Sequence, residues 1–238
     1  MNRLEIMSLA FQGEQRDSFN GTFIEVLHSY KINHEAKDVE FLAFFACATM
    51  TCNDQQDKDR VEDFLKTVQK RTESVWEYID LEMYMLDYAF ETETLQLLML
   101  MHEIIMTTQT IERSVQLSVR YNQDLTSFFV NIFKNAGIEG VFPDSTYDPQ
   151  KKIWTFLRLM VRKNGADLGL WGSWIKAIDL QIPLDAKLAQ AAVDMGIYDL
   201  NAPTAKSRED ITDYFRVLFP LDPAKGYFAL RSYSMMRE

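Results

Sequence analysis

Apolar residues recur at intervals of three and four along most of the chain, which is the spacing of an α-helix. Glycine and proline, which interrupt helices, number only 9 and 6 among 238 residues. The pattern predicts helices that begin at Asp38 and that cover residues 61–70, 73–106 and 151–163. We therefore expect an all-α fold.

Start and stop signals for helices are clearest near the C-terminus. Asp185 stands immediately before a run of strong helix formers, and Gly196 ends that run. Ser207 opens a variant of the capping box and predicts a helix to about Phe219. Asp222-Pro-Ala predicts the start of the last helix. The C-terminal part is thus predicted to be a row of short, capped helices.

The segment 135–150 contains two glycines and two prolines and predicts a loop between two helical regions. Charge divides at the same place. Residues 1–143 hold 12 Lys and Arg against 23 Asp and Glu, whereas residues 144–238 hold 13 against 12. We expect two helical subdomains with this boundary, a single compact unit being the alternative. A nucleic-acid surface would lie in the less acidic C-terminal region.

Composition excludes several classes of protein. With 47% hydrophobic residues, the chain can form a sizeable core. Its most apolar stretch, 95–106, is shorter than the roughly 20 residues that span a bilayer, and residues 1–10 lack the apolar run of a signal peptide. These features favour a soluble, cytoplasmic protein. Two cysteines and three histidines cannot supply an iron–sulfur or clustered zinc site, so we expect no metal, no other cofactor and no disulfide.

The predicted helix 151–163 has a basic face. Lys151, Arg158 and Arg162 are spaced at i, i+7 and i+11 and share one side of a helix, while the apolar residues fall on another. A basic face above a core is usually only solvated, and the spacing alone favours that interpretation. Beside a nucleic acid, the same face would contact phosphates.

Several stretches, in order along the chain, are similar to one family. Lys151-Lys-Ile-Trp-Thr-Phe-Leu-Arg-Leu-Met-Val-Arg-Lys-Asn resembles Lys-Arg-Leu-Asn-Leu-Phe-Leu-Arg-Trp-Met-Val-Arg-Lys-Asp of that family, and Ala166-Asp-Leu-Gly-Leu-Trp resembles its Val-Asp-Leu-Gly-x-Trp. Ile182-Pro-Leu-Asp follows at the expected distance, Leu218-Phe-Pro-Leu-Asp-Pro is similar to a Pro-x-Asp-Pro segment of the family, and Asp38-Val-Glu is similar to an N-terminal helix. The chain thus resembles DUF2400, a family of uncharacterised bacterial proteins that is itself similar to helix-hairpin-helix DNA glycosylases.

The resemblance implies a helix-hairpin-helix, glycosylase-like fold with DNA as the partner. Asp185 matches the catalytic acid of the glycosylase superfamily. Lys151 is, by position, the candidate for the lysine that attacks the sugar in bifunctional members. The basic side chains expected to contact nucleic acid are Lys152, Arg158, Arg162 and Lys187.

The chain departs from the family pattern at two places. The family continues Pro-Leu-Asp-Thr-His, whereas Ala186 and Lys187 follow the aspartate here. The family also has a Gly-Ser step before its lysine, where this chain has Tyr147-Asp148. The change removes a glycine that would let backbone amides approach a phosphate, and Asp148 adds an unfavourable negative charge.

Two functional hypotheses follow. The first is an N-glycosylase that excises bases from DNA, with or without lyase activity, in which Asp185 stabilises an oxocarbenium-like state. The alternative is a catalytically inactive protein that keeps the scaffold and binds nucleic acid or another protein. The retained aspartate and the basic helix favour the enzyme, whereas the absent Thr-His pair and the acidic N-terminal region favour the binding module. Position alone explains Asp185 as a helix cap and Lys151 and Lys187 as solvated side chains.

Overall fold

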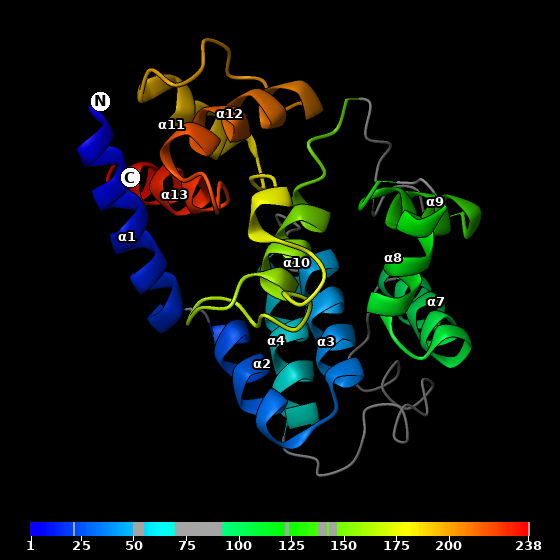
Figure 1. Cartoon of the computed structure of the whole chain (residues 1–238). Coiled ribbons are helices and arrows are strands. Elements are labelled where there is room, and N and C mark those ends of the chain that lie inside the picture. The colour runs from blue at the N-terminus through cyan, green and yellow to red at the C-terminus, as the bar shows by residue number, and fades with distance from the viewer. Residues whose placement is uncertain are drawn as a thin grey trace. The chain divides into compact units, whose positions relative to one another are not determined.

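The structure, a computed structural model, describes residues 1–20, 22–49, 55–69, 92–121, 124–137, 142 and 147–237. Throughout these residues the regular elements are helical, and none is a strand (Figure 1). The prediction of an all-α fold is therefore confirmed. The chain divides into two compact units, one formed by residues 1–21 and 143–238 and the other by residues 22–142.

Each unit is built from its own set of helices. The first contains α1 (Arg3–Asn20), α10 (Lys151–Val161), the 3-10 turn η1 (Ala177–Asp179), α11 (Ala186–Asp194), α12 (Ala205–Leu218) and α13 (Lys225–Met235). The second contains α2 (Thr22–Asn33), α3 (Ala36–Thr49), α4 (Gln55–Gln69), α7 (Thr92–Thr108), α8 (Ile111–Arg120) and α9 (Ser127–Asn135).

Most helix positions agree with the pattern of apolar residues, but three helices begin at residues other than those predicted. Helix α4 begins at Gln55, ahead of the predicted start at residue 61. Helix α12 is capped by Thr204, with Ser207 at the third helical position, so Ser207 completes the capping box and does not open it. Helix α13 begins at Lys225, after the predicted Asp222. Residues 73–91 of the predicted long helix lie outside the described residues.

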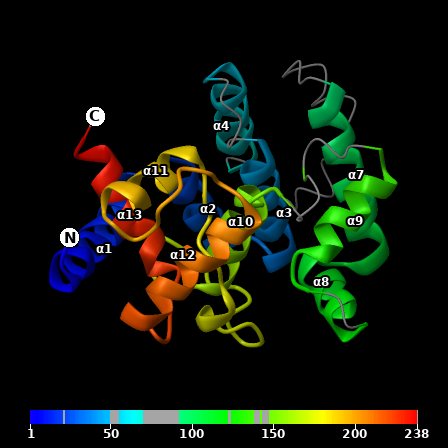
Figure 2. The same cartoon turned by 90° about the horizontal axis from the view of Figure 1, so that it is seen from above.

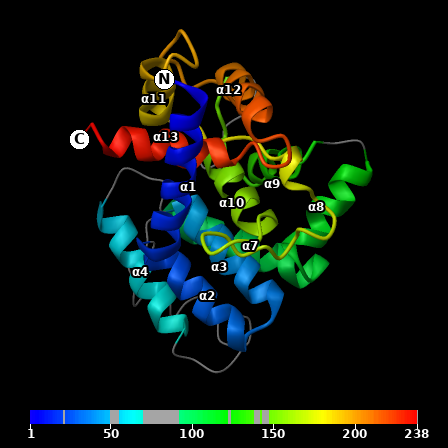
Figure 3. The ribbon, with the colours of Figure 1, turned by 60° about the vertical axis from the view of Figure 1, so that its left-hand side comes forward.

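The N-terminal helix does not belong with the acidic region that follows it. The units divide between residues 142 and 143, but α1 packs on α13 in the C-terminal unit, as Figure 2 and Figure 3 show from two directions. Gly13 allows this contact, since a Cβ there would lie 2.5 Å from both Phe228 O and Ser232 Oγ. The charge pattern could not predict this packing because it depends on the shape of two helices.

The core of the first unit positions the segment that leads into α11. Apolar side chains of α1, α11, α12 and α13 form one buried cluster, and Ile182 and Leu184 belong to it. The amide of Ile182 also donates to Thr212 Oγ1 on α12, at 3.1 Å. Apolar packing and this hydrogen bond therefore fix the segment in place. Asp185 follows it directly and lies at the edge of the core.

The second unit has an aromatic core and a buried carboxylate. Phe44 of α3 packs against Phe129 and Phe142, with ring centroids 5.3 and 5.4 Å apart. Glu40, only 1% exposed, accepts hydrogen bonds from the amides of Ile111 and Glu112 at the start of α8. Glu40, the last residue of the Asp38-Val-Glu stretch, thus caps a neighbouring helix of its own unit.

Two properties of the described residues bear on membranes and metals. The helices found there are all too short or too polar to cross a membrane. The same residues contain no group of three or more His, Cys, Asp and Glu side chains placed to hold a metal ion. Cys47 is buried in α3, and Cys52 lies outside the described part of the chain.

Candidate active site

The two residues that the resemblance singled out as catalytic lie in contact. Lys151 is the first residue of α10 and Asp185 precedes α11. Lys151 Nζ lies 2.7 Å from Asp185 Oδ2, and the side chains are 33% and 31% exposed. An ion pair thus joins two helix starts that are 34 residues apart in the chain, at a place that solvent reaches.

Asp185 uses its two carboxylate oxygens differently. Oδ1 accepts a hydrogen bond from the amide of Leu188 at 2.9 Å, which is the N-cap interaction predicted from the sequence. Oδ2 accepts from Lys151 Nζ. The capping role is therefore confirmed, and it leaves one oxygen facing the lysine. A catalytic role for that oxygen stays a prediction.

Arg208 of α12 ties together the segments that carry this pair. Its Nη1 donates to Pro149 O at 3.2 Å and to Gln150 Oε1 at 3.4 Å, just before Lys151. Its Nε donates to Gln181 Oε1, four residues before Asp185. Arg208 is 5% exposed, and its guanidinium carbon lies 5.3 Å from the centre of the Trp154 ring. Arg208 is thus a positioning residue for the Lys151–Asp185 pair.

Replacement of Arg208 by lysine is expected to uncouple the pair. A single ammonium cannot reach acceptors on both segments at once, so the segments become less fixed relative to each other. A double-mutant cycle between Lys151→Met and Asp185→Asn, followed by urea unfolding, should give a coupling of about 0.5–1 kcal/mol in the parent and close to zero in the Arg208→Lys background. Arg216→Lys, an exposed change on the same helix, should keep the parental coupling. An unchanged coupling in Arg208→Lys would show that Arg208 does not position the pair.

The turn before α10 contains Tyr147-Asp148 where the resemblance predicts a Gly-Ser step, and a side-chain hydrogen bond closes it. Asp148 Oδ1 accepts a hydrogen bond from the Gln150 amide at 2.6 Å and closes the turn. Gln150 has a φ of +51°, in the left-handed region that glycine adopts most easily, and is 4% exposed. The sequence had indicated only an unfavourable charge for Asp148. In the structure this carboxylate instead accepts a hydrogen bond from a backbone amide. The residue that donates it, Gln150, has a strained backbone conformation and stands directly before Lys151.

Two of the four side chains expected to contact nucleic acid do not lie on the surface. Arg158 and Arg162 are each 3% exposed, so the expectation that they grip phosphates is wrong for the described structure. Helix α10 is thus buried at Arg158 and Arg162 as well as on its apolar side, whereas Lys151 at its start is partly exposed. Helical spacing placed the two arginines on one face correctly, but spacing does not show which acidic segments cover that face.

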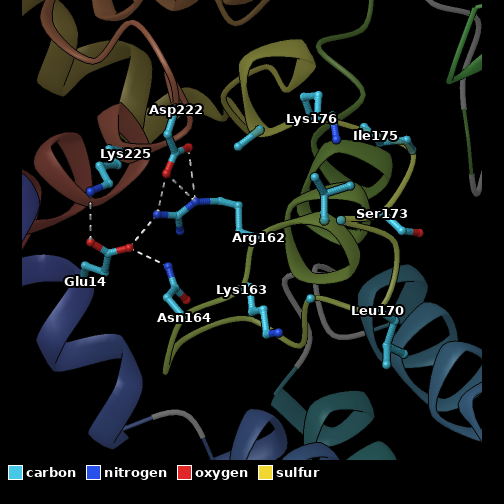
Figure 4. Close-up of a pocket in the computed structure, with 14 residues that line it drawn as sticks. Glu14, Arg162, Lys163, Asn164, Leu170, Ser173, Ile175, Lys176, Asp222 and Lys225 are labelled. Atoms are coloured by element: carbon cyan, nitrogen blue, oxygen red, sulfur yellow. Dashed lines mark hydrogen bonds and ion pairs between the residues drawn. The ribbon is translucent and has the colours of Figure 1, made fainter.

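Carboxylates from three separate segments surround Arg162. Its Nη1 lies 2.6 Å from Asp167 Oδ2. Its Nε lies 3.0 and 3.1 Å from the oxygens of Asp222, and its Nη2 pairs with Glu14, as Figure 4 shows. Arg158 Nε lies 3.2 Å from Asp167 Oδ1. These five side chains, here called the arginine network, connect α1, α10, the loop after α10 and the segment between α12 and α13.

Arg162 and the carboxylates around it shift one another's pKa values. Burial alone would lower the pKa of Arg162, but Asp167, Asp222 and Glu14 outweigh it, so the pKa is raised above its ordinary value. Burial raises the pKa of Asp167, and the nearby Arg158 and Arg162 oppose that rise. Arg162 therefore stays protonated and holds the surrounding carboxylates.

Sequence reasoning missed the acidic members of this network, although a signal existed for two of them. Asp167 and Asp222 both stand within the stretches that carried the family resemblance, in Ala166-Asp-Leu-Gly-Leu-Trp and Leu218-Phe-Pro-Leu-Asp-Pro. Two acidic residues without an assigned role, beside two arginines, could have suggested ion pairs. No comparable signal marks Glu14, which lies far away in the chain.

Lys152 and Lys187 flank the Lys151–Asp185 pair. Lys152 is the second residue of α10 and is half-buried, and Lys187 is the second residue of α11 and is exposed. Their positions at two neighbouring helix starts leave the prediction of phosphate contacts standing. A cavity of about 660 Å³ in the same unit lies at the other end of α10, and neither Lys151 nor Asp185 lines it.

Comparison with known proteins identifies a family. The family described as "Protein of unknown function (DUF2400)" matches residues 24–236, a range that contains the Lys151–Asp185 pair, Arg208 and every member of the arginine network except Glu14. Comparisons with curated proteins and with solved structures gave no match. Because the match covers most of the chain, the protein belongs to the DUF2400 family of proteins of unknown function.

Proposed function

We propose that this protein binds DNA and excises a base as an N-glycosylase with lyase activity, using Lys151 and Asp185. The observation that carries the proposal is the 2.7 Å contact between Lys151 Nζ and Asp185 Oδ2. An amine and a carboxylate within hydrogen-bond distance, each about one third exposed, form a nucleophile with an adjacent proton acceptor. The strained Gln150 beside them is a further sign of a functional site.

The reaction needs both groups. Lys151 Nζ forms a bond to C1′ of the sugar while the bond from C1′ to the base nitrogen breaks, and the base leaves with the bonding electron pair. Asp185 Oδ2 stabilises the positive charge that develops on the sugar and accepts the proton that the attacking nitrogen loses. Asp185 returns this proton to O4′ as the bond from C1′ to O4′ breaks, which gives an imine between Lys151 and C1′. Asp185 then accepts a proton from C2′, and the 3′ phosphate leaves with the electron pair of the bond from C3′ to oxygen, which cuts the strand.

DNA contacts in this proposal come from Lys152 and Lys187. Replacing both by glutamine is expected to weaken duplex binding similarly for all sequences and to reduce the slope of log K against log salt by about 1.8, because each lost phosphate contact removes about 0.9. The matched control is Lys66→Gln with Lys206→Gln. These two exposed lysines lie on α4 and α12, and each is paired with a carboxylate of its own helix, Glu62 and Asp210. Fluorescence anisotropy across a salt series measures the slope. Equal slopes in the two double variants would remove Lys152 and Lys187 from the interface.

The direct experiment is a gel assay on a panel of duplexes that each contain one modified base. Strand cleavage without alkali indicates base excision followed by lyase chemistry, and cleavage only after alkali indicates base excision alone. The proposal expects cleavage without alkali on at least one substrate. No cleavage under either condition, across a broad panel, would contradict it.

A second candidate is a binding module without catalysis, and specific observations favour it. Asp185 Oδ1 already caps α11, which is sufficient reason for an aspartate at that position. Asp148 occupies the Gln150 amide that a phosphate would otherwise use. Ala186 and Lys187 stand where the family has Thr-His. This candidate expects DNA binding that depends on Lys152 and Lys187, with no cleavage of any substrate in the gel assay.

A further inference from the structure

The cavity at the C-terminal end of α10 is a separate feature of the first unit. Its volume of about 660 Å³ falls in the range of small-molecule sites. Walls come from α1, from the residues after α10, from the loop 169–177 and from the start of α13. All of these belong to one compact unit. The cavity is thus built by residues whose relative positions the fold of that unit fixes.

One wall carries charges that are already balanced. Glu14, Arg162, Asp222 and Lys225 line it, as Figure 4 shows. Arg162 pairs with Asp222 and Glu14, and Lys225 Nζ lies 3.9 Å from Glu14 Oε2. With the rest of the arginine network beneath, three basic side chains face three acidic ones. The carboxylates on this wall are therefore held by cations and contribute little net repulsion to an anion.

The rest of the lining adds positive charge. Lys163 and Lys176 are both exposed and line the cavity, Lys163 beside Asn164 and Lys176 at a separate place next to Ile175 (Figure 4). Ser173 lines the cavity as well. Two lysines beside a balanced wall give the lining a net charge of about +2, which attracts anions.

The loop 169–177 is held close to α10. Gly169 has a φ of +65°, and a Cβ there would lie 2.9 Å from Lys163 Cα. The amides of Leu168 and Gly169 donate to Leu159 O at 2.8 and 3.1 Å, and the amide of Trp171 donates to Met160 O at 2.7 Å. These bonds satisfy carbonyls at the end of α10 and fix the loop beside Lys163. The backbone of the loop that follows Lys163 is thus fixed against the end of α10.

We propose that this cavity binds a small organic phosphate, with Lys163 and Lys176 as the phosphate-contacting residues. Lysine contacts phosphate as a point charge, and the Ser173 hydroxyl can donate to a phosphate oxygen. Leu170 and Ile175 line the same cavity and offer apolar surface to the organic part. This site is separate from the Lys151–Asp185 pair and does not depend on the proposed glycosylase activity.

The test is isothermal titration calorimetry of the full chain, at low ionic strength, with deoxyadenosine 5′-monophosphate and with inorganic phosphate. The nucleotide is expected to bind, and Lys163→Gln with Lys176→Gln should weaken it about tenfold, as two lost charge-assisted contacts would. Lys66→Gln with Lys206→Gln removes the same charge elsewhere and should leave affinity unchanged. Equal loss in both double variants would indicate only a general charge effect and would overturn the proposal.

Two further arms separate the sources of phosphate. Tighter binding of the nucleotide than of inorganic phosphate supports an organic ligand, since Leu170 and Ile175 then contribute. Equal affinity for the two overturns that part of the proposal. A short DNA duplex whose binding depends on Lys163 and Lys176, with no binding of either small phosphate, would show that these lysines contact the DNA backbone instead.

Discussion

Replacing Arg162 by leucine is expected to lower the free energy of unfolding by about 3–5 kcal/mol, because it leaves Asp167, Asp222 and Glu14 without their shared cation. Arg162 is 3% exposed, so water cannot take its place at little cost. Urea unfolding at neutral pH, followed by circular dichroism, measures the loss. A decrease below about 1 kcal/mol would show that the network is not held by this arginine.

Two comparisons make the Arg162 experiment specific. Arg216→Leu removes an exposed arginine that pairs with Asp213 on α12, and it should change stability by less than about 1 kcal/mol. Arg162→Leu combined with Asp167→Leu removes the guanidinium together with its most buried partner. The double variant should lose less stability than the sum of the two single losses, because each single change leaves a buried charge behind. Additive losses would contradict direct pairing.

Under the proposed glycosylase mechanism, Asp185→Asn is expected to reduce base release at least about 100-fold while the helix cap survives. The asparagine side-chain oxygen can still accept from the Leu188 amide, as Asp185 Oδ1 does at 2.9 Å. Its amide nitrogen cannot replace Oδ2, which accepts from Lys151. Loss of this partly exposed ion pair should cost less than about 1 kcal/mol of stability. Single-turnover base release, measured beside thermal melting, separates the two effects.

Asp185→Ala provides the matched comparison. It removes both the ion pair and the cap, and should cost about 1 kcal/mol more than Asp185→Asn. Both variants are expected to be equally inactive, although their melting temperatures differ. Full activity in Asp185→Asn would end the proposed role of Oδ2, whereas activity that simply follows melting temperature would mean that Asp185 acts only as a cap.

Local rules were sufficient for much of the helical framework. Helix α10 begins at Lys151 as predicted, Asp185 caps α11, and α11 ends before Gly196. These features depend on a few neighbouring residues, so spacing and capping preferences indicate them. The contact between Lys151 and Asp185 is longer-range. The resemblance named both residues as catalytic candidates, but neither it nor the spacing of the residues predicted the contact between them.

What the sequence could not indicate depends on packing between distant segments. The basic face of α10 was interpreted as a solvated or DNA-contacting surface, because nothing in residues 151–163 reveals that Glu14 and Asp222 cover it. The division by charge likewise assigned α1 to the acidic region. Its actual place depends on the fit of Gly13 against α13, which is a property of two surfaces together.

The sequence also does not indicate the roles of two polar residues, Asp148 and Arg208. Asp148 was interpreted as a charge that would repel phosphate, yet it closes the turn before α10 through the Gln150 amide. Arg208 carried no signal at all, since its acceptors come from two segments that meet only in the folded unit. Residues that position a site through long-range hydrogen bonds have no characteristic spacing in the chain.

Borohydride trapping tests the central claim most directly. The protein is incubated with each modified duplex and sodium borohydride, which reduces an imine between lysine and sugar to a stable bond. The account predicts a covalent adduct with at least one duplex, located by mass spectrometry on Lys151 and absent from Lys151→Met. An adduct on another lysine, or none with any duplex that the protein cleaves, would contradict the assignment of Lys151 and Asp185 as the active site.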